Sequence, residues 1–358
     1  MSRFLHNAWY PVAFSSDIAV GASPFARTLL ERPLVFFREQ AGALRVLEDR
    51  CPHRFAPLSK GSVAGGRLTC PYHGLQFDGT GRCVHNPHGN GEIPKAAVVA
   101  SLPVTEQNGV VWVWPGNPAQ AQEGLLPDLG EIHPKNEGST FTAYLRSEVD
   151  YEIVVDNLLD LTHADFLHPG LLSTKGAILA CHPQVEELSD RCVRLTLDLP
   201  LREYPAIPTF APFMPRPLDP AATRFQITWH APCIIDIVVH TSQEGPHGMV
   251  THSIQGAQLL APEAAHSTHY HVVGSRTMDA DDPSITAMVR MGALHAFAQE
   301  DGPMLKAVSE RLGEQRYADL QSVLLSSDAG AVRARRAFNR LLAHEVQCRR
   351  EGMMPSGS

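Results

Sequence analysis

Four residues in the first quarter of the chain could hold a metal cluster. They form two pairs, Cys51 with His53 and Cys70 with His73, so each segment offers one thiol and one imidazole. Two thiolates can hold one iron of a [2Fe–2S] cluster while two imidazoles hold the other, which raises the reduction potential far above that of an all-cysteine cluster. Structural zinc also accepts two cysteines and two histidines, but zinc fingers usually pair like with like. The mixed pairs therefore favour the iron–sulfur cluster, with zinc as the alternative.

A second set of residues could bind a single iron. Asn157, Asp160 and His163 follow at spacings of three, which predicts that they lie near one face of a helix. His168 comes five residues after His163, so a bend must bring it round. Two imidazoles and one carboxylate bind non-haem Fe(II) and leave positions open for O2 and substrate.

The carboxylate of this second set need not be local. Asp301 is the best candidate, because it lies on a later predicted helix that could pack across the first. The neighbouring Glu300 points about 100° away on a helix, so only one of the two should face the metal. The sequence alone leaves open that Asp301 is a solvated carboxylate and that His163 and His168 form a core pair.

Other cysteines and histidines give weaker signals. Cys83, His85 and His88 could mark a further metal site or a polar turn beside the second cluster segment. The remaining cysteines are isolated and are expected to be plain buried thiols; these are Cys181, Cys192, Cys233 and Cys348.

The elements that must position these residues fall into two regions of the 358-residue chain. The first 115 residues read as all-β, with a turn at 40–42 between two of the strands, and residues 116–138 read as a linker. Strands are expected at 27–30, 33–38, 44–47 and 110–114.

The rest of the chain mixes strands with embedded helices, which favours an α+β fold over regular βαβ alternation. Helices are expected at 151–163, 283–309 and 328–347, and strands at 192–199, 223–229, 233–239, 249–260 and 268–273.

Composition excludes several classes of protein. A net charge of −8 and an isoelectric point near 6.1 argue against nucleic-acid binding, whose footprint is basic. The chain has no signal-peptide pattern and no apolar run of membrane-spanning length. A cytoplasmic location is therefore expected, where clustered cysteines bind metal more often than they pair.

Taken together, these residues resemble the oxygenase components of the Rieske non-haem iron oxygenases, in the vanillate and dicamba O-demethylase branch. The similarity runs nearly end to end. It is carried by the segments 51–59, 70–75, 85–91 and 155–163, by Asn7 to Tyr10, by 260–263 with His269 and Tyr270, and by Glu300 with Asp301.

The resemblance implies an all-β Rieske domain at 1–115, followed at 116–358 by a catalytic domain with a helix-grip-like antiparallel β-sheet and helices. It makes Cys51, His53, Cys70 and His73 ligands of the cluster, and His163, His168 and Asp301 ligands of the iron. It also implies that Asn157 lies close to the iron and that Asp160 bridges His73 and His163 between neighbouring chains.

The resemblance further implies a monooxygenase that uses O2 and a small aromatic substrate. A separate reductase or ferredoxin would supply electrons from NADH or NADPH, because this chain has no flavin or nucleotide motif. The family assembles as head-to-tail rings, usually trimers. Four basic residues against one acidic residue at 51–82 could steer an acidic electron donor.

The expected reaction is O-demethylation of a methoxylated aromatic compound with release of formaldehyde. Ring hydroxylation, methyl hydroxylation, N-demethylation and a pure Rieske electron carrier remain alternatives. Substrate contacts are expected from Asp236, Gln258 and His230. The dicamba-demethylating enzyme of this branch carries histidine and asparagine near Gln258 and Asp236, and an aromatic residue at Gly292. A substrate with a hydrogen-bond donor group is therefore expected.

Overall fold

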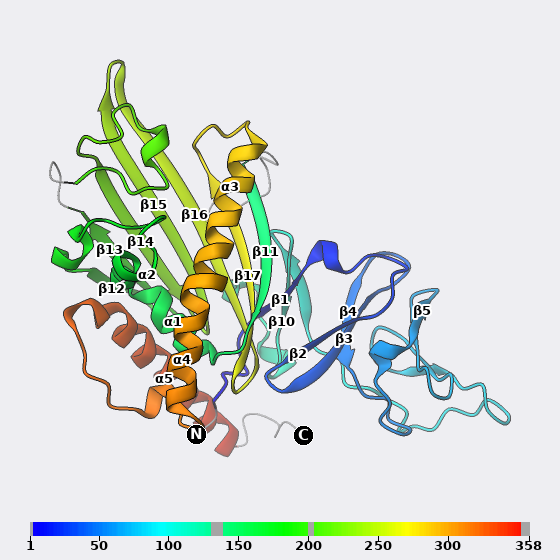
Figure 1. Cartoon of the computed structure of the whole chain (residues 1–358). Coiled ribbons are helices and arrows are strands. Elements are labelled where there is room, and N and C mark those ends of the chain that lie inside the picture. Colours follow the sequence, from blue (N-terminus) through cyan, green and yellow to red (C-terminus); the bar gives the residue numbers. More distant parts are fainter. Residues whose placement is uncertain (1–2, 130–138, 200–203, 352–358) are drawn as a thin grey trace. The chain divides into compact units, whose positions relative to one another are not determined.

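The computed structural model describes residues 3–129, 139–199 and 204–351 (Figure 1). Residues 130–138 of the predicted linker lie outside this description. None of the helices in the described ranges combines the length and the apolar character that a membrane span requires.

The chain divides into two compact units. The first contains the residues up to Leu126, together with Ala261–Ala265 and the C-terminal residues from Cys348. The second contains Pro127–Leu260 and His266–Gln347.

The first unit contains three small antiparallel sheets, which confirms the predicted all-β region. Their strands, in sheet order, are β1 (Tyr10–Phe14), β10 (Val110–Val113) and β9 (Val104–Gln107); β2 (Phe25–Leu29), β3 (Arg32–Arg38) and β4 (Leu44–Glu48); and β5 (Ser62–Ala64), β6 (Arg67–Thr69), β7 (Gln76–Phe77) and β8 (Cys83–His85). The predicted turn joins β3 to β4, where Gly42 has φ +91°, a conformation that glycine adopts without strain.

Two loops of this unit carry the predicted cluster ligands. The first follows β4 and contains Cys51 and His53, and the second joins β6 to β7 and contains Cys70 and His73. Both cysteines belong to one buried core cluster with side chains such as Leu58. The loops are therefore anchored by their cysteines.

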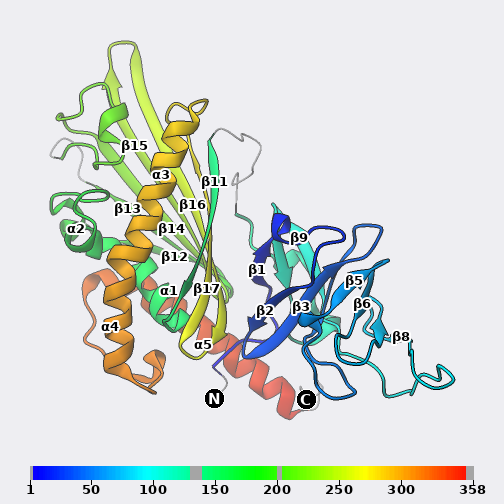
Figure 2. The ribbon, with the colours of Figure 1, turned by 45° about the vertical axis from the view of Figure 1, so that its right-hand side comes forward.

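The second unit contains a seven-stranded antiparallel sheet. Its order is β11 (Thr140–Ser147), β17 (Ser267–Arg276), β16 (Gly248–Ala264), β15 (Ile234–Gly245), β14 (Ala222–His230), β13 (Cys192–Asp198) and β12 (Gln184–Ser189). Figures 1 and 2 show the helices α3 (Pro283–His295) and α4 (Gly302–Leu312) lying in succession across this sheet. The predicted α+β architecture is confirmed.

The strand register identifies the face that the helices cover. Leu195, Ile227 and Ile237 stand opposite one another on β13, β14 and β15, so their side chains share a face. Gly330 of α5 (Ala329–Arg350) contacts Leu195 so closely that a Cβ would lie 1.9 Å from its side chain. We call the face that carries Leu195 and Ile237 the helix-covered face.

One predicted helix is broken. Residues 151–163 form α1 (Tyr151–Leu159) and a 3₁₀ turn (Leu161–His163) instead of one helix, and the short α2 (Ala164–Leu167) follows. Asp160 is extended, and its carboxylate accepts hydrogen bonds from the Thr162 N–H at 2.9 Å and the Thr162 hydroxyl at 2.7 Å. Aspartate favours such N-cap positions, so it ends one helix and starts the next turn.

Candidate metal centres

The two predicted cluster cysteines are buried at the base of their loops. Cys51 is 1% and Cys70 is 2% exposed, and their side chains interact with each other. Backbone N–H groups of His53 and Arg54 point at the Cys51 sulfur, as in sites where hydrogen bonds stabilise iron-bound sulfur. Burial raises the pKa of the Cys51 thiol to about 11, so a bound cation is needed to keep it as a thiolate.

The two predicted cluster histidines lie at the more exposed edge of the same loops. The ring centroids of His53 and His73 are 4.4 Å apart. Desolvation and the neighbouring positive charges of His53 and Arg54 lower the pKa of His73, which favours the neutral imidazole that metals bind. Two buried sulfurs beside two adjacent imidazoles fit the ligand set of a [2Fe–2S] cluster.

The segment that follows β8 supports the second cluster loop. The Nε2–H of His88 donates to the His73 carbonyl oxygen at 2.7 Å, and Pro87 lies against Gly74. Cys83 is buried in the core beneath the loops, where its thiol contacts the His85 carbonyl. These contacts fit the polar-turn alternative and bring together no further metal site in the described part of the chain.

In the second unit, His163, His168 and Asp301 converge. The Nε2 atoms of His163 and His168 lie 3.5 Å and 3.2 Å from Asp301 Oδ1. All three ligand atoms lie within 4.8 Å of one another, close enough to share one ion. Two imidazole nitrogens and one buried carboxylate fit the donor set that binds non-haem Fe(II).

The outer nitrogens of both histidines are also engaged. His163 Nδ1 lies 2.5 Å from the backbone carbonyl oxygen of Asp160, and His168 Nδ1 lies 2.7 Å from Glu300 Oε2. Nδ1 of His163 donates its proton to the Asp160 carbonyl oxygen, and Nδ1 of His168 donates its proton to Glu300. The Nε2 lone pair of each imidazole is then free to face Asp301. Burial alone would lower the pKa of His168, but Asp301 and Glu300 raise it above its ordinary value. The site is therefore negative and suited to a cation.

Asn157 and Asp160 lie beside this site in different ways. Asn157 Nδ2 donates to Asp301 Oδ1 at 3.4 Å, which places it next to the candidate iron ligands. Asp160 meets His163 through its backbone carbonyl, whereas its carboxylate is held by Thr162. The helix break at Asp160 means that these residues converge through a turn, and the predicted common helical face was wrong.

The other side of α1 is tied down by charged side chains. Glu152 forms a largely buried ion pair with Arg316. Asp156 accepts a hydrogen bond from the Tyr317 hydroxyl at 2.6 Å and lies 3.3 Å from Arg335 Nε. These contacts fix the helix that carries Asn157.

The predicted substrate residues do not share a face of the sheet. Gln258 stands opposite Ile235, two residues from Ile237, and so lies on the helix-covered face. The register pairs Asp236 with Ala257 and places it, with His230, on the opposite face. The expected joint contact of Asp236, His230 and Gln258 with one substrate is therefore corrected, because a shift of one residue moves a side chain to the other face.

On that opposite face Asp236 is buried against Gln255, whose Nε2 donates to it at 3.3 Å. Burial raises the pKa of Asp236 to about 6, while it lowers the pKa of His230 to about 4. Both groups are therefore disfavoured in their charged forms.

Replacement of Asp236 by asparagine is expected to stabilise the fold at pH 8. Above pH 6 the folded protein carries a poorly solvated charge that the unfolded chain solvates well, at a cost of about 3 kcal/mol. This cost declines as the pH falls from 6 towards the unfolded pKa. In urea unfolding, the variant's free energy of unfolding should exceed that of the unmodified chain at pH 8, and the difference should roughly halve at pH 5. Equal differences at both pH values would contradict a raised pKa for Asp236.

Sequence reasoning missed the contacts of Glu300 and Tyr270 near the iron site and the sheet face of Ile237. Glu300 was expected to face away but contacts His168. The buried Tyr270 hydroxyl donates to Gln258 Oε1 at 2.9 Å, and its ring lies 5.2 Å from that of Phe297. Ile237 takes the position on the helix-covered face that was assigned to Asp236. The sequence signals for these residues were the resemblance at His269–Tyr270 and the Glu300–Asp301 pair, and neither assigned a contact.

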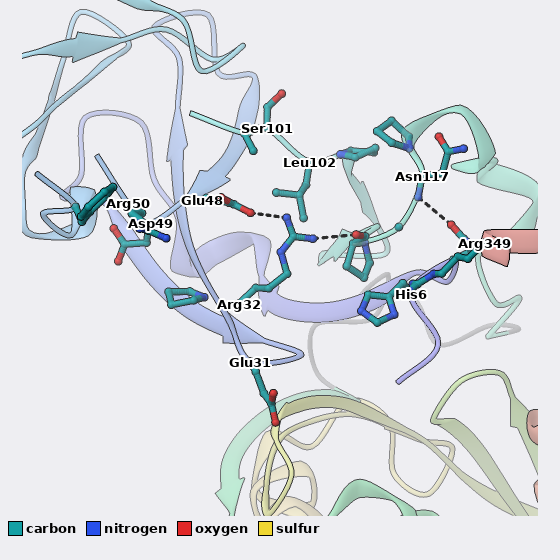
Figure 3. Close-up of a pocket in the computed structure, with 18 residues that line it drawn as sticks. His6, Glu31, Arg32, Glu48, Asp49, Arg50, Ser101, Leu102, Asn117 and Arg349 are labelled. Atoms are coloured by element: carbon teal, nitrogen blue, oxygen red, sulfur yellow. Dashed lines mark hydrogen bonds and ion pairs between the residues drawn. The ribbon is translucent and has the colours of Figure 1, made fainter. Parts of the chain in front are cut away.

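The first unit also contains a cavity of about 780 Å³. Figure 3 shows Arg32 in this cavity, bonded to Glu48 at 2.6 Å and to the Pro115 carbonyl oxygen at 3.0 Å. Arg50 and Asp49, which precede Cys51, also line it. None of the predicted ligands of either metal centre lines this cavity.

Two family models match the chain. The Rieske [2Fe-2S] domain matches residues 8–103, and the vanillate O-demethylase oxygenase C-terminal domain matches residues 147–344. Together they include all seven predicted metal ligands.

Known proteins of similar length match over almost the whole chain. The oxygenase component of dicamba O-demethylase from Stenotrophomonas maltophilia is 35% identical and is aligned over 94% of this chain and 98% of its own length. The vanillate O-demethylase oxygenase subunit of a Pseudomonas species is 29% identical, with 96% of each chain aligned. A crystal structure of dicamba monooxygenase bound to 3,6-dichlorosalicylic acid has a TM-score of 0.87 and 33% identity, and the alignment covers 96% and 99% of the two chains.

Proposed function

Because the chain belongs to the Rieske non-haem iron oxygenases of the vanillate and dicamba O-demethylase group, we propose that it removes a methyl group from a methoxylated aromatic compound by oxidation. It is an oxygenase component, and a separate reductase supplies its electrons. The observation that carries the proposal is the convergence of His163, His168 and Asp301 on one point beside the sheet.

When bound, the cluster supplies single electrons and the iron supplies the place where O2 is activated for hydroxylation. Hydroxylation of a methoxy carbon gives a hemiacetal, which collapses to a phenol and formaldehyde. Cys51, Cys70, His53 and His73 would hold the cluster. Asn157 would hold the Asp301 carboxylate in position through its 3.4 Å hydrogen bond.

The substrate is proposed to lie near Gln258 on the helix-covered face. The Tyr270 hydroxyl donates its proton to the side-chain carbonyl oxygen of Gln258. The N–H groups of the Gln258 amide therefore point away from Tyr270. Gln258 would then donate to an acceptor on the substrate, such as a carboxylate or a sulfonate. The expectation of a donor-bearing substrate depended on Asp236 together with Gln258, and Asp236 lies on the other face.

The shape of this region favours an aromatic ring with substituents. Ile237 offers an apolar wall, and Gly256, opposite it in the register, adds no side chain. Gly292 of α3 likewise leaves room beside Leu171. The proposal is therefore an aromatic compound larger than a bare methoxybenzene, with an anionic or carbonyl group.

A head-to-tail ring of chains, most simply a trimer, is proposed for electron transfer. The support is the exposed edge formed by His53 and His73, flanked by Phe55 and Tyr72, whose side chains are 62% and 60% exposed. Large apolar groups in such positions are typical of protein contacts. Asp160 of the next chain would meet this edge, in a cytoplasmic enzyme supplied with NAD(P)H.

The proposal is tested with the purified chain, a Rieske reductase and NADH. A panel of methoxybenzoates, methoxybenzenesulfonates, N-methyl anilines and methylbenzenes is screened for O2 uptake and formaldehyde. We expect one formaldehyde per O2 consumed with a methoxylated member. Uptake of O2 with hydroxylated products but no formaldehyde would contradict O-demethylation and favour ring or methyl hydroxylation.

A further inference from the structure

Two carboxylates that are adjacent in sequence contact the two nitrogens of the His168 imidazole. Glu300 Oε2 lies 2.7 Å from His168 Nδ1, and Asp301 Oδ1 lies 3.2 Å from His168 Nε2. On a regular α-helix, neighbouring side chains diverge by about 100°. Here the backbone Ala296–Asp301 is π-helical, and the Gly302 N–H bonds to the Phe297 carbonyl five residues earlier. Such π segments are frequent at functional sites.

We propose that Glu300 is a positioning residue for the metal held by His163, His168 and Asp301. The Glu300 carboxylate accepts the Nδ1–H of His168, which fixes the tautomer and points the Nε2 lone pair at the metal position. This inference rests on the proposed ligand set.

The charges of the site give Glu300 a second role. Asp301 is the one charged ligand of the three, so a bound dication would keep a net positive charge. The surroundings are buried, since the His168 and Asp301 side chains are 2% and 4% exposed. A buried charge without a partner is costly. Glu300 balances it through His168, whereas the corresponding nitrogen of His163 faces only a neutral carbonyl oxygen. The two imidazoles are thus unequal, and His168 is the more strongly polarised.

The far oxygen of Glu300 is also engaged. Glu300 Oε1 lies 3.6 Å from Nε2 of His295, an exposed residue at the end of α3. The Glu300 carboxylate therefore has an imidazole on each side, because one oxygen contacts His168 and the other faces His295.

The test is the iron affinity of Glu300→Gln, measured on the full chain by competition with a chromogenic Fe(II) chelator. Glutamine keeps the size and an acceptor oxygen but removes the charge. We expect affinity to fall about 10- to 100-fold, as for other outer partners of metal-bound histidines. The exposed Glu310→Gln on α4 is the matched control and should stay within twofold of the unmodified chain. The cluster absorbance should not change in either variant.

Two further measurements separate the possible failures. Asp301→Asn should lose the mononuclear iron; if it retains iron, the ligand set itself is wrong. If Asp301→Asn loses iron but Glu300→Gln binds it within twofold of the unmodified chain, the role of Glu300 is overturned. An equal drop in thermal midpoint for iron-free and iron-loaded Glu300→Gln would also overturn it, because that result assigns Glu300 to the fold alone.

Discussion

Replacement of Asp160 by asparagine is expected to reduce turnover on the order of 100-fold or more while both metal centres stay in place. The proposed electron path runs from the partner subunit's His73 through Asp160 to His163. The Asp160 carboxylate would accept the outer N–H of the partner subunit's His73, while its backbone carbonyl oxygen faces Nδ1 of His163. An amide lacks the charge that strengthens the first of these hydrogen bonds.

Asparagine is the informative replacement because the structure gives Asp160 two roles besides the proposed bridge. Its backbone carbonyl faces His163, and its carboxylate caps the 3₁₀ turn through Thr162. Asparagine is as good a cap as aspartate, so the local structure should survive. Alanine would also remove the cap, which would lower the stability by about 1 kcal/mol. The loss of the cap could then not be separated from the loss of the proposed bridge.

The measurement is the rate at which O2 reoxidises the reduced cluster in the presence of substrate, monitored by stopped-flow absorbance. The unmodified chain should reoxidise within its turnover time, and the Asp160→Asn variant should reoxidise far more slowly with unchanged iron content. Near-normal reoxidation and turnover in the variant would remove Asp160 from the path.

Replacement of Asp301 by alanine is expected to abolish product formation and to leave the cluster intact. Asp301 is the shared neighbour of His163 and His168, and it is the only carboxylate within 4.8 Å of both metal-facing nitrogens in the described residues. Without it the site loses its charged ligand, so the loss of metal affinity should exceed the 10- to 100-fold typical of outer partners.

Iron analysis and the electron paramagnetic resonance signal of the reduced cluster check this expectation. The variant should contain the two cluster irons with an unchanged signal and no mononuclear iron. Asp236→Asn is the matched control, because it changes a buried aspartate of the same unit on the opposite sheet face; its iron content and turnover should stay within twofold. Product formation by Asp301→Ala would refute the assignment of the metal site.

Residue types and spacing were sufficient to predict that the four candidate cluster ligands would gather. Cys51, His53, Cys70 and His73 lie in two short loops. The first loop follows the predicted strand β4, whereas the second joins β6 to β7, which were not predicted. Asp301 was harder to predict, because its approach to His163 depends on the packing of helices more than 130 residues apart. Only the resemblance to a family made that choice firm.

Other features depended on geometry that the sequence does not display. Asp160 has the spacing of a helix-face residue, but its N-cap hydrogen bonds to Thr162 outweigh helix continuation. Asp236 missed the helix-covered face by one position, because strand side chains alternate and a pattern cannot fix the register to one residue. Glu300 approaches His168 through a widened π turn, which periodicity at 3.6 residues per turn cannot anticipate.

One chain is expected to carry two separate iron centres. The decisive measurement is the iron and acid-labile sulfide content of the unmodified chain, before and after brief treatment with an Fe(II) chelator. We expect three irons and two sulfides per chain, and a loss of one iron on chelation with retention of the red-brown cluster. Two irons before and after chelation, with full O2-dependent product formation, would contradict it.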